Sequence, residues 1–316
     1  MKICIQTGDV IDRIGAKKGY ALFKKTGFES IDWNLDHALR IAPKNYDEFM
    51  QNKEYIGTCI FEKSLDAVIK HYADELAIIK ENGLEINQAH APFPAYRVGY
   101  PEFFDYYIEI IKRNIEYCDY IGCKYLVVHG ISTIPNREDM DCKTVTELNY
   151  KLYRSLIPTL KNCKTTKVCL ENLFGWCYGH ATEGVCSNPY EAVEIIDTLN
   201  CEAGKEAFCL CLDTGHLNLL NKDFNTYITT LGSRIKCLHI HDNDARADLH
   251  LAPFTGNIDW KGFCTALKSI GFDDDISFET FAQTNRAEAF NEELIEPWLN
   301  LICKIGESFK KQILED

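Results

Sequence analysis

Two kinds of apolar pattern alternate along the whole chain. Short apolar runs have the length of buried strands, whereas longer segments carry apolar residues every three or four positions, the spacing of an amphipathic helix. The short runs predict β-strands at residues 2–7, 28–33, 84–89, 124–129, 167–171, 208–213, 235–241 and 275–279. The longer segments predict helices at residues 62–82, 102–121, 144–163, 189–199, 259–270 and 290–312.

The order of these elements predicts the fold class. Strands that alternate with helices indicate a parallel sheet, because each helix must carry the chain back before the next strand begins. Eight such units in 316 residues match the size of a closed (β/α)8 barrel. The first strand is not followed by the glycine fingerprint of an open nucleotide-binding sheet. We therefore predict an α/β fold, one TIM-barrel domain over residues 1–316, in which residues 34–60 form a cap or lid, or an oligomer contact, inserted after the second strand.

Composition changes this picture in two respects. Lys and Arg total 34 against 47 Asp and Glu, so the formal charge is −13, and such a surface repels the phosphates of nucleic acid. The first residues read directly as a strand, and no apolar run approaches the roughly 20 residues of a membrane helix. We expect a cytoplasmic protein that does not enter a membrane.

The fifteen cysteines include no Cys-x-x-Cys pair, and we expect them to be reduced, with several buried in the core.

One residue that can bind a metal stands at the end of each of six consecutive predicted strands, and these residues come in the order of the strands. They are His90, His129, Glu171, Asp213, His241 and Glu279. The strands of a β/α barrel all point the same way, so these side chains should meet at one mouth. Buried carboxylates that face one another repel unless a cation compensates them. Glu171, Asp213, His241 and Glu279 therefore predict a site for a divalent metal. His239 shares a strand face with His241, so it either points into the site or fills the barrel, and we favour filling.

The strand-end motifs resemble those of the xylose isomerase-like TIM-barrel superfamily. The matching segments are His90-Ala-Pro-Phe93, Val127-Val-His129, Leu170-Glu-Asn172, Asp213-Thr-Gly-His216, His239-Ile-His-Asp-Asn243 and the terminal Glu279. The likeness covers nearly the whole chain. The superfamily contains sugar phosphate isomerases and epimerases, and also AP endonucleases of the endonuclease IV type. Barrels of this kind often associate, so the resemblance also implies a homo-oligomer.

The resemblance to ketose 3-epimerases implies one divalent ion, with Mn²⁺ or Zn²⁺ preferred over Mg²⁺ or Co²⁺. Its ligands would be Glu171, Asp213, His241 and Glu279. Glu171 and Glu279 would also be the catalytic pair that removes and returns a substrate proton. His216 matches a residue that contacts substrate oxygens, and Arg246 stands one residue short of the matching arginine. We expect rim aromatic residues, Trp33, Phe93, Phe174, Trp176 and Phe254, to supply the apolar wall of a sugar pocket.

The resemblance to endonuclease IV implies further metal ligands. These would be His90, His129, His216, Asp248 and His250. The segment Asp248-Leu-His250, followed by Gly256-Asn-Ile258, reproduces the spacing of those nucleases, although the loop between His241 and Asp248 is shorter. Sugar-type relatives also retain Asp-x-His before Gly-x-Ile-Asp-Trp, which here is Gly256-Asn-Ile-Asp-Trp260. The extra ligands therefore leave both functions open.

We predict a metal-dependent sugar (phosphate) isomerase or epimerase that acts on a ketose or keto-sugar through an enediolate. An AP endonuclease with a zinc cluster ranks second, because of the acidic charge and because residues 172–188 contain no Lys or Arg. A lyase or dehydratase acting on an oxidised sugar is a further alternative, since it begins with the same proton abstraction. The expected partner is a small-molecule sugar rather than nucleic acid.

Overall fold

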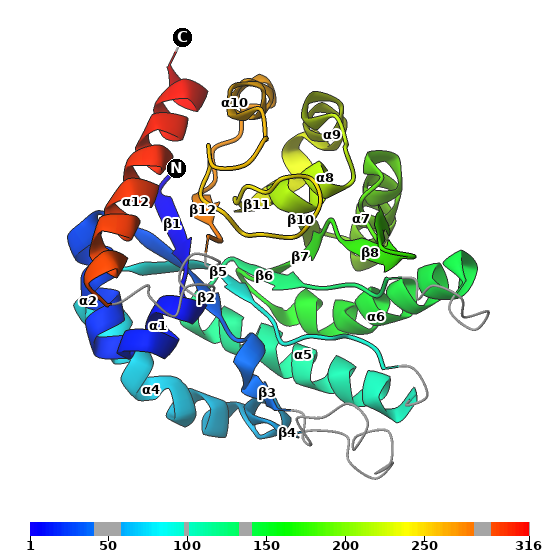
Figure 1. Cartoon of the computed structure of the whole chain (residues 1–316). Coiled ribbons are helices and arrows are strands. Elements are labelled where there is room, and N and C mark those ends of the chain that lie inside the picture. Colours follow the sequence, from blue (N-terminus) through cyan, green and yellow to red (C-terminus); the bar gives the residue numbers. More distant parts are fainter. Residues whose placement is uncertain (41–57, 98–100, 133–140, 281–291, 316) are drawn as a thin grey trace.

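Eight parallel strands form the centre of the molecule (Figure 1). The computed structural model describes residues 1–40, 58–97, 101–132, 141–280 and 292–315. The barrel strands are β1 (Ile3–Gln6), β2 (Ser30–Asn34), β5 (Glu85–His90), β6 (Tyr125–Val128), β7 (Lys167–Glu171), β10 (Phe208–Asp213), β11 (Ile235–His239) and β12 (Ile276–Phe278). They pair in the order β11-β10-β7-β6-β5-β2-β1-β12. Backbone bonds from Ile240 N to Ser277 O (2.9 Å) and from Glu279 N to Ile240 O (3.1 Å) join the two ends. The predicted TIM barrel is confirmed.

Helices surround the barrel, and each packs against the next (Figure 1). In ring order they are α2 (Ala16–Thr26), α4 (Leu65–Glu81), α5 (Pro101–Ile121), α6 (Cys142–Asn162), α7 (Pro189–Ala203), α9 (Phe224–Leu231), α10 (Trp260–Ser269) and α12 (Glu292–Leu314). Shorter helices are α1 (Gly8–Ile14), α8 (Thr214–Leu219), η1 (Asp36–Ala38), η2 (Ile60–Glu62) and η4 (Gly232–Arg234). All six predicted helices are present, whereas the sequence pattern missed α1, α2, α8 and α9.

Two small antiparallel pairs stand outside the barrel. They are β3 (Leu39–Arg40) with β4 (Thr58–Cys59), and β8 (Phe174–Cys177) with β9 (His180–Glu183). The first pair brackets the predicted cap, whose residues 41–57 lie outside the described part of the chain. None of the described helices combines the length and the apolar character needed to cross a bilayer.

Apolar side chains and thiols from β6, β7, β10 and β11 pack together inside the barrel. They form one buried cluster of Tyr125, Val127, Cys169, Cys209, Cys211 and Cys237. Burial raises the pKa of the cluster's thiols well above the usual value, so they stay protonated at neutral pH. All fifteen cysteines are free thiols, as expected. This cluster carries no charged side chain, so the charged and polar groups of a site are expected at the carboxyl ends of the strands.

Candidate metal centre

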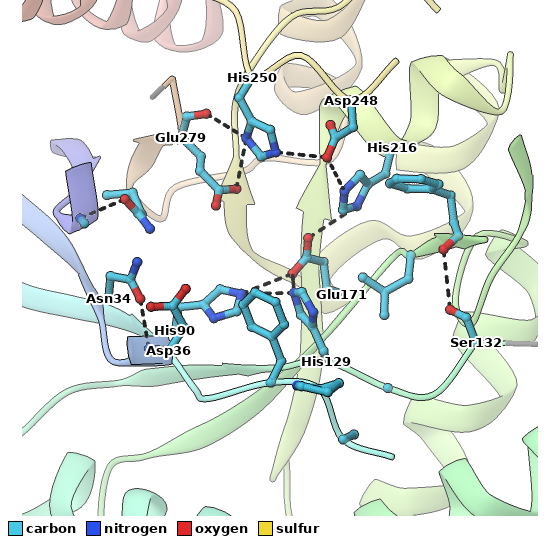
Figure 2. Close-up of a pocket in the computed structure, with 18 of the residues that line it drawn as sticks. Asn34, Asp36, His90, His129, Ser132, Glu171, His216, Asp248, His250 and Glu279 are labelled. Carbon is cyan, nitrogen blue, oxygen red and sulfur yellow. Dashed lines mark hydrogen bonds and ion pairs between the residues drawn. The ribbon is translucent and has the colours of Figure 1, made fainter. Parts of the chain in front are cut away.

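The strands deliver polar side chains to one cavity at their carboxyl ends. For β5, β6, β7, β10, β11 and β12, the last residue or the one directly after it is His90, His129, Glu171, Asp213, His239 and Glu279. A cavity of about 740 Å³ opens over these ends, and Figure 2 shows the side chains that converge on it. His216 of α8, with Asp248 and His250 from the loop after β11, completes its wall. Asp213, His239 and His241 are wholly buried behind that wall.

His90, His129 and Glu171 form the first group that could hold a metal ion. Nε2 of His129 lies 2.9 Å from Oε2 of Glu171 and 3.0 Å from Nε2 of His90. Nδ1 of His90 lies 2.9 Å from the carbonyl oxygen of Ala91, so it donates there and leaves Nε2 free to bind a metal. The two imidazoles and one carboxylate therefore present ligand atoms to a common point.

Asp213, His216 and His241 form the second group. Oδ1 of Asp213 accepts a hydrogen bond from the backbone N–H of His216 (2.7 Å) and so caps α8, while Oδ2 lies 3.0 Å from Nε2 of His241. Nδ1 of His216 donates to the carbonyl oxygen of Asn172 at 2.9 Å. Asp213 thus has both of the roles that its position allows, helix cap and candidate ligand.

His241, His250 and Glu279 form the third group. The rings of His241 and His250 stack with centroids 3.9 Å apart. Nδ1 of His250 donates to the carbonyl oxygen of Glu279 at 3.1 Å, and Nε2 lies 3.0 Å from Oδ2 of Asp248 (Figure 2). The structure therefore brings all nine predicted and additional ligands into one connected network.

Several buried polar atoms in this network make no hydrogen bond. They are Nδ1 of His239, Nδ1 of His241 and Oδ1 of Asp248. Buried polar atoms in proteins are nearly always paired, because an unpaired one costs about 1–3 kcal/mol. A divalent cation ligated by imidazole and carboxylate would satisfy such atoms. The residues present therefore fit a metal centre.

The pKa shifts of these side chains also fit a metal centre. Burial disfavours the charged form of His216, but the carboxylates of Asp213, Asp248 and Glu171 together outweigh burial and raise the pKa of His216 to about 10. Burial likewise disfavours the charged form of His250, but the bond with Asp248 and the charges of Glu279 and Asp213 together raise its pKa to about 9. Burial would raise the pKa of Glu171, yet the facing His129 and His239 hold it well below its usual value. Protons on histidines thus compensate carboxylates that a metal would otherwise neutralise.

Four predicted substrate contacts do not line the cavity. Trp33 is 1% exposed, its Nε1 donates to Glu75 (3.2 Å), and its ring packs on Tyr72. This corrects the expectation for Trp33, because alternation along β2 turns Asp32 into the barrel and Trp33 outward toward the helices. Arg246, Trp176 and Phe254 are exposed outside the cavity lining.

Two other aromatic residues do form part of the cavity wall. Phe93 stacks on His129 with ring centroids 4.8 Å apart, and Phe174 meets His216 edge-on at 4.8 Å. Both contacts place an apolar face directly beside candidate ligands. Of the predicted rim aromatic residues, Phe93 and Phe174 therefore line the cavity, together with Tyr96, Ile131 and Leu173.

Asp32 and Gln88 are not among the site residues predicted from the sequence, and His239 is predicted to fill the barrel. All three are buried and meet inside the barrel: Oδ2 of Asp32 lies 3.1 Å from Nε2 of His239 and accepts a hydrogen bond from Nε2 of Gln88 (2.9 Å). The signal that could have found them is the period-two alternation of the strands, which places Asp32 and His239 on the inner face.

Comparisons with known proteins give one fold and two kinds of relative. A family model described as a xylose isomerase-like TIM barrel matches residues 21–300. The L-ribulose 3-epimerase of Mesorhizobium japonicum is 35% identical over 81 residues, 26% of each chain. The probable endonuclease 4 of Mesoplasma florum is 25% identical over 241 residues, 70% of this chain and 75% of that protein. The crystal structure of a D-psicose 3-epimerase from Clostridium cellulolyticum H10 with D-tagatose superposes with a TM-score of 0.66 at 15% identity and covers 100% of both chains.

Proposed function

Because the chain belongs to the xylose isomerase-like TIM barrel family, we propose that it is a divalent-metal-dependent epimerase or isomerase of a ketose or keto-sugar. One observation carries the proposal: Glu171 and Glu279, from different strands, line the same cavity, and both approach Nδ1 of His239, at 3.5 and 3.4 Å. Two carboxylates in one metal-binding cavity are the parts that proton transfer beside a carbonyl needs. The likeness to L-ribulose 3-epimerase and D-psicose 3-epimerase supports this choice.

Four residues would bind the metal, and two of them, the glutamates, would also transfer protons. Glu171, Asp213, His241 and Glu279 would hold the ion, and the chemistry that it supplies when bound is Lewis-acid polarisation of the substrate carbonyl. One of the two glutamates removes the proton from the carbon beside that carbonyl, and the other returns a proton to the opposite face of the enediolate. The low pKa of Glu171, set by His129 and His239 against burial, keeps it in the carboxylate form that a base requires.

The cavity wall suits a small polyhydroxylated molecule. Its outer part offers hydrogen-bonding side chains: Gln6, Asp12, Asn34, Asp36 and Ser132. Phe93 and Phe174 add apolar surface, which is typical of small-molecule sites that combine a few polar groups with aromatic walls. Among the described residues that line the cavity there is no Lys or Arg. This lining favours the uncharged hydroxyls of a sugar over a phosphodiester.

An AP endonuclease is the second candidate. Two extra groups of candidate ligands favour it, because both contact the central set around Glu171 and Asp213. One group is His90 with His129, and the other is His216 with Asp248 and His250. The charge of −13 argues against it, because duplex binding needs cations to neutralise phosphates. A lyase or dehydratase shares the first proton abstraction and differs only in its product.

Product analysis separates these candidates. Mn²⁺-loaded and Zn²⁺-loaded protein would be incubated with free and phosphorylated ketoses, with oxidised sugars and with an abasic-site duplex. We expect epimeric or isomeric ketoses to form with the metal-loaded protein and not after chelation. The exposed His71 on α4 offers a matched control, His71→Gln, which should behave as the wild type. Cleavage of the duplex without any sugar conversion would overturn the proposal.

A further inference from the structure

His239 is held from one side by a carboxylate deep in the barrel. Its Nε2 lies 3.1 Å from Oδ2 of Asp32, and Nε2 of Gln88 donates to the same oxygen at 2.9 Å. All three side chains are at most 1% exposed. A carboxylate accepts hydrogen bonds and cannot donate them when ionised, so the imidazole carries a proton on Nε2. A metal-binding histidine in proteins usually has such a partner, which fixes the tautomer and the ring orientation.

The other ring nitrogen of His239 faces the candidate ligands. Nδ1 lies 3.5 Å from Oε1 of Glu171 and 3.4 Å from Oε2 of Glu279, is buried and makes no hydrogen bond. Adjacent ligands on one ion with bonds of about 2.0–2.2 Å lie roughly 3.0–3.5 Å apart. Ligand atoms of Glu171, Asp213 and His239 all lie within 4.8 Å of one another. Nδ1 beside two carboxylates needs a positive partner, which is either a proton on the imidazole or a bound cation that takes the place of that proton.

His241, the histidine that the family resemblance assigns to the ion, is placed differently. Its Nε2 contacts Oδ2 of Asp213 at 3.0 Å, and its ring stacks on His250. Its metal-binding groups are formed with His216 and Asp213, or with His250 and Glu279, and neither includes Glu171. Of these two histidines, His239 is the one whose nitrogen is directed at both glutamates.

We propose that Nδ1 of His239 is a ligand of the divalent ion held by Glu171 and Asp213, and that Asp32 is a positioning residue that keeps the imidazole proton on Nε2. This inference rests on the metal dependence in the proposed function and adds a ligand to it. The ion would then be held by His239 in addition to Glu171, Asp213, His241 and Glu279, because Nδ1 of His239 lies beside both glutamates. Gln88 supports the arrangement by fixing Asp32.

A direct test observes the nitrogen itself. Wild-type protein labelled with ¹⁵N-histidine is titrated with Zn²⁺ and followed by long-range ¹H–¹⁵N NMR, with His239 assigned from the His239→Gln spectrum. Asp32→Asn provides a second assignment if His239→Gln does not fold, because it alters the partner of Nε2. We expect Zn²⁺ to move the Nδ1 resonance to a metal-bound position while Nε2 keeps its proton. An Nδ1 that stays protonated with Zn²⁺ bound overturns the proposal.

Metal affinity gives an independent readout. By chelator competition we expect Asp32→Asn to weaken Zn²⁺ binding by about 10–100-fold, the effect typical of losing a supporting contact, and His239→Gln to weaken it at least as much. His71→Gln should leave the affinity unchanged. Wild-type affinity in both site variants, together with loss of binding in Asp213→Asn, overturns the role of His239 and leaves the metal centre standing. Absence of Zn²⁺ binding by the wild type overturns the proposed metal dependence as well.

Discussion

The side chain of Asn172 makes two hydrogen bonds with the backbone of Asp213. Nδ2 donates to the carbonyl oxygen at 2.9 Å, and the backbone N–H of Asp213 donates to Oδ1 at 2.7 Å. Because Asn172 directly follows Glu171, this pair ties the ends of β7 and β10 together. It fixes two candidate ligands relative to each other through the backbone.

Replacing Asn172 by Asp should therefore disturb both stability and metal binding. The new carboxylate keeps the acceptor but faces the carbonyl oxygen of Asp213 without a donor, which costs about 1–3 kcal/mol. We expect metal affinity to fall by about 10–100-fold. Urea unfolding and chelator competition measure the two effects. Asn162→Asp, on the exposed end of α6, is the matched control and should change neither by a comparable amount.

Gly215 provides the space that His241 occupies. A Cβ at this position would lie 1.9 Å from Cε1 of His241, so Gly215→Ala must displace the imidazole from Asp213. We expect weaker metal binding and a loss of about 1–3 kcal/mol in the free energy of unfolding. Gly122→Ala is the control: it has open space but a φ of 79°, so it should lose about 1 kcal/mol and keep full metal affinity. Equal metal affinity in both variants would contradict this account of Gly215.

Metal binding should release protons. Burial lowers the pKa of both imidazoles, but the surrounding carboxylates together raise the pKa of His216 to about 10 and that of His250 to about 9. At neutral pH both imidazoles are protonated, and an ion that neutralises the carboxylates of Asp213 and Glu279 removes part of what stabilises those protons. Apparent Zn²⁺ affinity should therefore increase as the pH rises from 7 toward about 9. Calorimetric titrations in buffers of different protonation enthalpy count the released protons, and a count of zero would rule out this description.

Trp33 should matter for stability and not for substrate. Trp33→Phe removes the bond to Glu75 and part of the packing on Tyr72 and Tyr117, which should cost about 1–3 kcal/mol. We expect KM for any sugar substrate to remain unchanged in the folded variant. Thermal unfolding and steady-state kinetics make the comparison. A raised KM at unchanged stability would restore the substrate role that the sequence predicted.

The barrel was predictable from the sequence because strand and helix periodicities are local, and the strand pattern recurs eight times and the helix pattern six times along the chain. The ligands at the strand ends were also predictable, since parallel strands must bring them to one rim. The short helices α1 and α8 were not, because two turns are too few to show a period. Trp33 was misplaced at the rim, although alternation along β2 turns it outward. His239 was placed correctly inside the barrel, but its contact there was not predicted. Alternation shows which face a residue occupies, whereas the partner across the barrel, such as Asp32 for His239, depends on the closed fold.

The central claim is metal-dependent proton transfer by Glu171 and Glu279. The most direct measurement is uptake of carbon-bound deuterium by a ketose in D₂O, followed by NMR with Mn²⁺-loaded wild type and Glu279→Gln. The account predicts deuterium at the carbon beside the carbonyl with the wild type, abolished by chelation and by the substitution. Absence of exchange with every ketose, with the metal bound and the protein folded, would contradict it.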